Sequence, residues 1–326
     1  MVQNMEIISI GDRISPGEYS LHSCFRNVVN LTDGESLVSL VTRKVGSGPV
    51  NIVADGLDPG SIETLRIDRE TIFINGDSYF FDRRLLFYSH SGTGPVDKGH
   101  LAKHLLIFED SLLELSPPKS LAFLIDKKRE DDFRSSFEKG FAERMKGGVG
   151  DILGLPGGLS PKQNNIVVPV FPVSDPGWRD RGRSVHSGSR TEVLHYESPP
   201  DGKFWQGIKH IKGLGFGLTP SGDDFIAGLL VALNMLERLD QYDRSNLKNE
   251  IVSISRGGNL LSNSFISLAA SGYLFEGFKI LLETLLQGSG TEVRTATKKL
   301  LFLGASSGSD MAVGFLLTIK KFLDLT

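Results

Sequence analysis

Residues 213–224 read Gly213-Leu-Gly-Phe-Gly-Leu-Thr-Pro-Ser-Gly-Asp-Asp224 and lead into the apolar run Phe225 to Leu236. Glycines at alternate positions of this stretch permit backbone conformations that a Cβ atom would forbid. Helix-start signals follow them: Thr219 or Ser221 as the N-cap, a proline between these two, and two acids in the first turn. The run that follows is apolar at nearly every position, which predicts a helix that is buried on all sides.

A helix that starts in this way is typical of anion sites. The glycine turn leaves backbone N–H groups at the helix end directed into a cleft, where an anion can accept their hydrogen bonds. We expect a small anionic substrate to contact Gly215, Gly217, Thr219, Ser221 and Gly222. Ordinary capping of a helix by a tight entry loop explains the same residues equally well.

A similar sequence motif occurs again near the C-terminus. The segment Ser221-Gly-Asp-Asp-Phe-Ile-Ala-Gly-Leu229 aligns with Ser307-Gly-Ser-Asp-Met-Ala-Val-Gly-Phe315, 86 residues further along. Both copies place a glycine inside the helix, Gly228 and Gly314, where glycine costs about 1 kcal/mol relative to alanine. We therefore expect the two helices, or a ligand, to approach closely at these glycines. The two helix starts, with Ser307 and Gly308 in the second, are then expected to face each other across one site.

The long motif from Gly213 to Leu230, with Gly304-Ala-Ser-Ser-Gly-Ser-Asp-Met-Ala-Val-Gly314, resembles the bacterial family that contains the AllH subunit of oxamate carbamoyltransferase. Leu21-His-Ser-Cys-Phe-Arg-Asn-Val-Val-Asn-Leu31 is similar to the N-terminal segment of that family. Phe216 stands where the family usually has proline, so the resemblance implies a less rigid turn here. It also implies a role in carbamoyl transfer, within purine or allantoin catabolism, beside companion enzyme subunits. It assigns no catalytic residues.

The composition is that of an ordinary globular chain, and its 326 residues suffice for one large core or two domains. With 36 basic and 39 acidic residues, no broad positive field recruits nucleic acid or anionic lipid. The longest apolar run, 225–236, is shorter than the ~20 residues that span a membrane. Charges at Glu6, Asp12 and Arg13 interrupt any signal-peptide core, and the single Cys24 excludes an internal disulfide. We expect a cytoplasmic protein with neither a membrane nor a nucleic-acid partner.

The first 90 residues are divided by Gly, Pro and Asp into short apolar-rich pieces, which predicts strands of a sandwich or small barrel. These pieces are 20–31, 37–41, 50–54 and 61–67. Asn75-Gly76, between two strand-like runs, is the strongest short signal for a hairpin. His22 and Cys24 lie two residues apart, on one face of a predicted strand. They are either a base and nucleophile or, more simply, structural residues with an inert thiol.

Helical periodicity dominates the later chain. The predicted helices cover 101–115, 131–145, 225–236, 260–270, 272–286, 292–303 and 311–323. His100 and His104 have the spacing of a metal-ligand pair but no glutamate between them and no third ligand, so we expect them to face solvent or cap a helix. The predicted fold is α+β, with a barrel- or sandwich-like N-terminal domain and a mainly α-helical C-terminal domain.

The predicted domains are a β-rich segment with one or two helices over 1–146, a connecting region over 147–202 and an α-helical segment over 203–326. The connecting region begins with many Gly and Pro residues, which favours a hinge. It carries a Ser/Gly-rich stretch with four arginines, Arg179, Arg181, Arg183 and Arg190. Clustered guanidinium groups can clamp a carboxylate or phosphate, and a mobile exposed loop is the simpler interpretation.

Three carboxylates, Asp223, Asp224 and Asp310, are the candidate catalytic groups. Acids near a helix N-terminus are stabilised by about 0.3–1 kcal/mol each, which explains them without any chemistry. If the two helix starts converge, the three can hold Mg²⁺, although no cofactor is evident in the sequence. Adjacent helical residues point about 100° apart, so we place Asp224 in a capping role and Asp223 towards the cleft. By the repeat, Ser307 caps the turn that contains Asp310.

Three functions follow from these features. The first is an AllH-like subunit of a carbamoyl-transferring enzyme, which binds carbamoyl phosphate or an oxamate-like anion at the glycine-rich helix start. The second is a metal-dependent hydrolase that uses the three aspartates. The third is a non-catalytic ligand-sensing or scaffold subunit. Because no general base, nucleophile or cofactor fingerprint stands out, we expect the chain to supply part of a site that another subunit of an oligomer completes.

Overall fold

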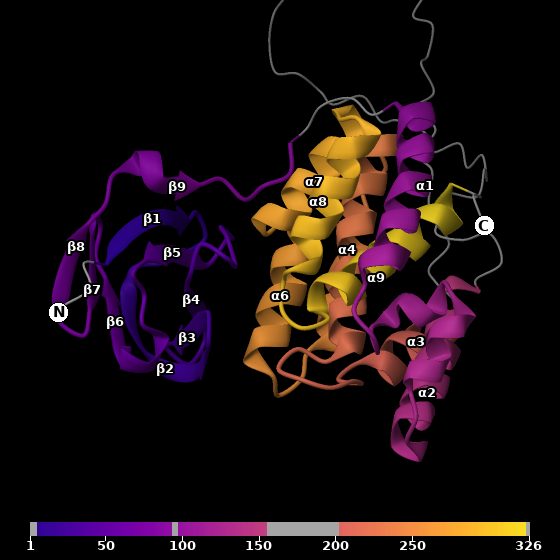
Figure 1. Cartoon of the computed structure of the whole chain (residues 1–326), viewed down its shortest axis with the longest axis horizontal. Helices are drawn as coiled ribbons and strands as arrows, with labels where there is room; N and C mark the ends of the chain where they lie inside the picture. Colours follow the sequence, from indigo (N-terminus) through magenta and orange to yellow (C-terminus); the bar gives the residue numbers. More distant parts are fainter. Residues whose placement is uncertain (1–4, 93–96, 155–201, 324–326) are drawn as a thin grey trace, which may run out of the picture.

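The computed structural model describes residues 5–92, 97–154 and 202–323. A curled sheet and a body of packed helices lie side by side, joined by one chain segment (Figure 1). The predicted α+β fold is confirmed, because a nine-stranded half-barrel over residues 6–87 precedes a helical region over residues 98–322.

Short apolar strands build the half-barrel in the spatial order β8-β7-β6-β2-β3-β4-β5-β1-β9. The pairs β4–β5 and β1–β9 are parallel, and the other neighbours are antiparallel. The strands are β1 (Glu6–Gly11), β2 (Gly17–Phe25), β3 (Val28–Thr32), β4 (Leu37–Val41), β5 (Asn51–Asp55), β6 (Thr64–Ile67), β7 (Thr71–Ile74), β8 (Asp77–Phe80) and β9 (Leu86–Phe87). Their inward apolar side chains form a core of their own.

The predicted hairpin at Asn75-Gly76 is confirmed. Both residues have positive φ, 51° and 92°, as a two-residue turn of this type requires. The side chain of Asn75 also accepts hydrogen bonds from the backbone N–H groups of Glu63 and Thr64, at 2.9 and 3.1 Å. The turn residue therefore shapes the β7–β8 hairpin and also fastens it to β6.

The helical region has a second, larger core, to which α1 and α2 contribute together with the later helices. Its helices are α1 (Lys98–Leu115), α2 (Ser136–Leu153), α3 (Gly202–Ile211), α4 (Ser221–Asp240), α5 (Ser245–Ser255), α6 (Leu260–Ala270), α7 (Glu276–Gln287), α8 (Gly290–Leu301) and α9 (Ser307–Phe322). Helix α2 continues through Gly147, where the connecting region was expected to begin. The four arginines predicted to cluster in that region lie outside the described residues.

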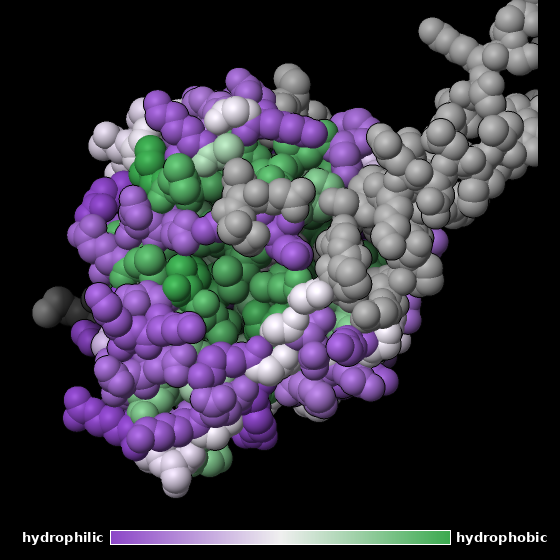
Figure 2. All heavy atoms as spheres, turned by 90° about the vertical axis from the view of Figure 1, so that its right-hand side faces the viewer, coloured by the Kyte–Doolittle hydropathy of each residue, from purple (hydrophilic) through white to green (hydrophobic). Residues whose placement is uncertain are grey.

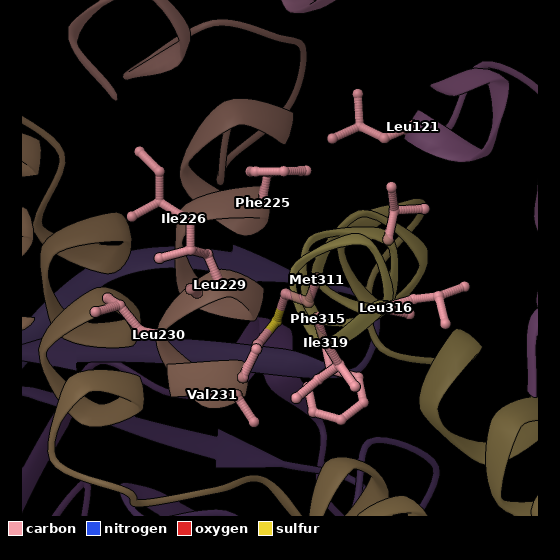
Figure 3. Close-up of a cluster of buried hydrophobic side chains, with 14 of the residues drawn as sticks. Leu121, Phe225, Ile226, Leu229, Leu230, Val231, Met311, Phe315, Leu316 and Ile319 are labelled. Carbon is pink, nitrogen blue, oxygen red and sulfur yellow. The ribbon is translucent and has the colours of Figure 1, made fainter. Parts of the chain in front are cut away.

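Helix α4 is buried along most of its length at the centre of this region, and α9 packs against it (Figures 1 and 3). A Cβ atom at Gly228 would lie 2.0 Å from the carbonyl oxygen of Met311, and one at Gly314 would lie 2.2 Å from that of Phe225. Only glycine allows backbones to approach this closely. The prediction that the two interior glycines mark a close helix contact is therefore confirmed, and the helices themselves fill the space.

The sheet docks on the helical region through backbone and side-chain hydrogen bonds. The Ser47 N–H donates to the Glu276 carboxylate, and the Glu276 N–H donates to the Ser47 carbonyl oxygen, both at 2.9 Å. Nearby, the Ser91 N–H donates to the Gly272 carbonyl oxygen at 3.2 Å and the Leu274 N–H to the Ser89 carbonyl oxygen at 2.9 Å. These contacts place the segment after β9 directly against the end of α6.

The surface of the helical region that is turned away from the sheet has hydrophobic residues gathered at its centre, within a hydrophilic border (Figure 2). A concentration of apolar surface of this kind is typical of protein–protein interfaces. Among the described helices, none combines the length and apolar character needed to cross a membrane.

Candidate functional site

The starts of α4 and α9 meet, as the sequence repeat predicts. The Thr219 and Ser307 hydroxyl oxygens are 2.9 Å apart. Ser307 hydrogen-bonds the carboxylate of Asp224, and Ser221 hydrogen-bonds that of Asp310. Each helix start thus supplies a serine to the aspartate of the other.

The reciprocity extends to the helices that precede the two starts. A Cβ atom at Gly222 would lie 1.7 Å from the carbonyl oxygen of Ile211 at the end of α3, and one at Gly308 would lie 2.1 Å from that of Leu300 near the end of α8. Each glycine thus lets its helix start fit tightly against the preceding helix end. The 86-residue sequence repeat thus corresponds to matching contacts, of α4 with the end of α3 and of α9 with the end of α8.

The two paired aspartates are buried, with Asp224 2% and Asp310 0% exposed. The Asp310 carboxylate accepts hydrogen bonds from the Leu121 N–H at 2.6 Å and from the Ser306 hydroxyl at 3.0 Å. Burial raises the pKa of Asp310 to about 6 despite these bonds. Burial, and then the nearby charge of Asp310, raise the pKa of Asp224 well above its usual range. Both carboxyl groups therefore keep their protons to a higher pH than an ordinary aspartate does.

The raised pKa of Asp310 predicts a pH dependence of stability. Between the ordinary value of 3.8 and about 6, the folded protein binds a proton at Asp310 that the unfolded chain releases. The stabilisation from this group is therefore fully present below about pH 4 and is lost as the pH rises through about 6. We expect the free energy of unfolding of the wild type, relative to Asp310→Asn, to fall over this range in urea titrations.

The free energy of unfolding of Asp310→Asn must be subtracted from that of the wild type at each pH. Other carboxylates have lowered pKa values, and they make the protein less stable as the pH falls. A hydrogen bond from Arg43, for example, lowers the pKa of the exposed Asp55. An Asp55→Asn variant is the control, and its difference from wild type should change little or in the opposite sense on acidification. A wild-type minus Asp310→Asn difference that stays constant from pH 4 to neutral pH would contradict the raised pKa.

The capping roles predicted from the sequence are wrong. The N-cap of α4 is Pro220, which makes no side-chain capping bond, and the N-cap of α9 is Ser306. Asp223 is turned towards the glycine loop, where its carboxylate accepts the N–H of Gly213 at 2.7 Å. Asp224 is instead the buried partner of Thr219, at 3.1 Å. Proline fits the N-cap because it has no N–H that needs an acceptor. Asp223 and Asp224 are therefore not needed as caps, and their carboxylates accept hydrogen bonds from other parts of the site.

The glycine loop, residues 213–219, is the accessible part of the site. Gly213, Gly215 and Gly217 have φ values of +67°, +135° and +94°, which few residues other than glycine adopt. The first-turn N–H groups of residues 222–224 are already taken by carbonyl oxygens within the chain. The N–H groups of residues 215–219, by contrast, find no acceptor among the described residues. Donors available to an anion thus lie in the loop and not in the helical turn.

A metal centre built from the three aspartates does not form in the part of the chain that the structure describes. No group of three or more His, Cys, Asp or Glu side chains is placed there to hold a metal ion. The two helix starts do converge, but Asp223 is turned to the glycine loop while Asp310 is bonded to the backbone of Leu121.

The histidines singled out in the sequence have other surroundings. His22 and Cys24 are exposed on β2, where the imidazole contacts the Ser23 hydroxyl and the thiol contacts the Pro59 carbonyl oxygen. They therefore do not form a nucleophile–base pair. His104 is only 4% exposed and stacks edge-on against His100 with 4.0 Å between ring centres, while Asp97 caps α1. The expectation that both histidines face solvent or cap a helix is wrong.

Two contributors to the site were not predicted. Ser306 occupies the place that Pro220 has in the first copy, so alignment of the two copies one residue further upstream would have indicated it. The Leu121 N–H belongs to a 3-10 helix, Leu121–Leu124, that lies far away in the sequence. No local pattern points to it, because only the tertiary fold brings that turn to Asp310.

Comparison with protein families identifies the same two parts of the chain. The family model described as oxamate carbamoyltransferase subunit AllH matches residues 211–319, and the model described as AllH family N-terminal domain matches residues 6–89. The first match contains both helix starts, and the second coincides with the half-barrel. Searches of curated proteins and of solved structures found no match.

Proposed function

The chain belongs to the AllH family, and on that premise we propose that it is a subunit of a carbamoyl-transferring enzyme of the oxamate carbamoyltransferase type. Carbamoyl phosphate and oxamate are anions, and acyl transfer between them depends largely on the stabilisation of developing negative charge. A subunit of this kind must offer fixed hydrogen-bond donors to an anion.

In this proposal the small anionic substrate binds to the glycine loop. The observation that carries it is the set of N–H groups at residues 215–219 that lack an acceptor among the described residues. Successive N–H groups in a glycine-rich turn form a concave anion site even without the helical turn. Gly217 is exposed, and no described atom lies within 4 Å of the position of a Cβ there, so a ligand has room to approach.

The buried pair Asp224 and Asp310 has a positioning role in the proposal. Neither carboxylate reaches solvent to any extent, so neither can meet a substrate without a rearrangement. Thr219, however, contacts both Asp224 and Ser307 and also ends the glycine loop. The buried pair therefore fixes the position of Thr219. Because Thr219 ends the glycine loop, this also restricts the conformation of the loop where the substrate binds.

A companion subunit completes the site in this account. Phe216 and Leu218 of the glycine loop are 42% and 37% exposed, and Phe137, 67% exposed, packs edge-on against Phe216 with 5.7 Å between ring centres. Exposed aromatic and aliphatic groups beside a substrate loop are suited to burial in an interface. A partner that covers them would also exclude water from the bound anion.

Replacement of Gly217 by valine tests the substrate loop. A β-branched side chain strongly disfavours φ near +94°, so the loop must change its path and its N–H groups lose their common direction. We expect at least about a tenfold loss of affinity for carbamoyl phosphate and oxamate, as is typical when charge-assisted hydrogen bonds are removed. Isothermal titration calorimetry of the wild type and the variant measures it.

Gly76→Val is the matched control. Gly76 has φ of +92° and, as at Gly217, no atom of the described residues lies within 4 Å of a Cβ there, but it belongs to the β7–β8 hairpin. Both variants therefore introduce similar backbone strain, and only the one in the glycine loop should affect affinity. A folded Gly217→Val protein with unchanged affinity for both anions would refute the assignment of the loop.

A further inference from the structure

The glycine loop is held at both of its ends by the end of α5 and the turn that follows it, residues 256–259. Immediately before the loop, the Lys212 ammonium donates to two backbone carbonyl oxygens at the C-terminal end of α5. Near the end of the loop, the side-chain NH₂ group of Asn259 donates to the carbonyl oxygen of Leu218 at 2.5 Å. The segment between α5 and α6 therefore fixes where the loop begins and where it ends.

The Asn259 side chain has two separate bonding roles. Its Oδ1 atom caps α6, because it accepts the backbone N–H groups of Leu261 and Ser262 at 3.0 and 3.2 Å. The other end of the amide is then the NH₂ group, and this group is the one that meets the Leu218 carbonyl oxygen. Because the cap holds the amide in one orientation, the donor that it offers to the loop has a fixed position.

The bond from Asn259 sets the direction of one N–H group of the loop. A trans peptide unit is planar, so its N–H and C=O groups point in opposite directions. Asn259 holds the Leu218 carbonyl oxygen on the side of α6, and the Thr219 N–H of the same peptide unit therefore points away from α6. The Thr219 side chain is fixed as well, with its hydroxyl oxygen 3.1 Å from the Asp224 carboxylate and 2.9 Å from the Ser307 hydroxyl.

The Thr219 N–H is thus the best fixed of the available donors. It finds no acceptor among the described residues, as is true of the other N–H groups of residues 215–219. The carbonyl oxygens of residues 215–217, in contrast to that of Leu218, accept no hydrogen bond from the part of the chain that the structure describes. A donor that is already in place costs less ordering when a ligand binds, so it contributes more to affinity.

We propose that Asn259 is a positioning residue of the substrate site, and that it directs the Thr219 N–H at a carboxylate or phosphate oxygen of the bound anion. This inference rests on the function proposed above, because it takes the glycine loop as the binding site. Asn259 acts through the Leu218–Thr219 peptide unit and does not touch the substrate itself.

Replacement of Asn259 by serine separates the two roles of the side chain. Serine is also a good N-cap, so α6 keeps its start, but its side chain is too short to bond both α6 and the Leu218 carbonyl oxygen. We expect the full chain to bind carbamoyl phosphate and oxamate roughly threefold to tenfold more weakly, the usual effect of one lost hydrogen bond. Isothermal titration calorimetry measures the change.

Asn259→Asp and Asn75→Asp form a matched pair of variants. Each of the two asparagines accepts two backbone N–H groups and donates to one carbonyl oxygen at 2.5 Å, which for Asn75 is that of Ser61. Aspartate keeps the acceptor and removes the donor in both cases. Anion affinity should fall in Asn259→Asp and stay unchanged in Asn75→Asp. The neutral Asn259→Ser shows the same loss without an added negative charge.

The amide resonance of Thr219 gives a readout that a purely structural role of Asn259 would not change. In a titration of the wild type with oxamate, followed by two-dimensional amide NMR, we expect the Thr219 proton to move downfield further than any other amide proton of residues 215–219. A hydrogen bond to an anion has this effect on the donor proton. The displacement should be smaller in Asn259→Ser at saturating oxamate.

The outcomes separate this inference from the assignment of the loop. If Gly217→Val loses affinity while Asn259→Ser binds both anions like the wild type, Asn259 has no positioning role and the loop assignment stands. If the wild type binds neither anion, or if Gly217→Val binds them unchanged, the loop assignment fails and this inference fails with it. Should Asn259→Ser not fold, Asn259→Asp decides in its place, because aspartate is as good a cap as asparagine.

Discussion

Replacement of Gly228 by alanine is expected to lower the free energy of unfolding by about 3 kcal/mol, the upper end of the usual cost of overpacking. The new Cβ would lie 2.0 Å from the Met311 carbonyl oxygen and 2.9 Å from the Phe315 backbone nitrogen. Neither atom can move without a shift of α9, which carries a large part of the core. Alanine has the higher helix propensity by about 1 kcal/mol, but the clash with backbone outweighs that gain.

Gly147→Ala is the control with the opposite expected sign. Gly147 lies inside α2 and is exposed, and no atom in the part of the chain that the structure describes lies within 4 Å of a Cβ there. Alanine there should raise the free energy of unfolding by about 1 kcal/mol, from helix propensity alone. Urea unfolding of both variants measures the contrast. A Gly228→Ala protein as stable as the wild type would show that α4 and α9 do not pack as described.

Much of the fold follows from local sequence patterns. The turn at Asn75-Gly76, the strand-sized apolar pieces before residue 90 and the all-round apolar run from Phe225 each predict the element that forms. These signals are local, since they depend on φ requirements and on the period of apolar residues. How the sheet closes is not local, because the parallel pair β1–β9 joins the first strand to the last.

The meeting of the two helix starts could be predicted because the same sequence motif occurs at both of them. Gly228 and Gly314 recur at one spacing, and reciprocal close contacts require a small residue on both sides. The individual roles of the acids could not be predicted in the same way. Asp223 and Asp224 are neighbours of identical chemistry, and their partners, Gly213 for one and Thr219 with Ser307 for the other, are set by the path of the loop.

Tertiary contacts also explain the remaining differences between the sequence predictions and the structure. His104 faces the protein interior because α1 packs in the helical core, which a two-histidine spacing does not reveal. A polar cavity at the C-terminal end of α4 is lined by Lys248, Asn234 and His90, among other residues. These three come from separate segments, none of which carries a motif. Sites assembled from distant segments leave no trace in the spacing of residues along the chain.

The purified chain alone is expected to show little carbamoyl transfer, and activity should appear when companion subunits are added. The buried aspartates do not reach solvent, and the exposed donors around Gly217 can stabilise charge but cannot transfer protons. A missing proton-transfer group commonly costs about 10²–10⁴ in rate. The apolar residues Phe216 and Phe137 beside the loop give a partner a surface on which to dock.

Gly217→Val in the reconstituted enzyme should reduce kcat/KM without loss of assembly, whereas Gly76→Val should leave both unchanged. This contrast separates a substrate role of the loop from a purely structural role. It also distinguishes a substrate-binding subunit from a scaffold. If the chain were only a scaffold, Gly217→Val protein that still assembles would leave the enzyme fully active.

The most direct measurement is the rate of carbamoyl transfer between carbamoyl phosphate and oxamate, by the chain alone and by the chain with its companion subunits. The account predicts a rate near background for the chain alone, and robust turnover on reconstitution that falls with Gly217→Val. Robust turnover by the isolated chain, or reconstituted turnover that is indifferent to Gly217→Val, would contradict it.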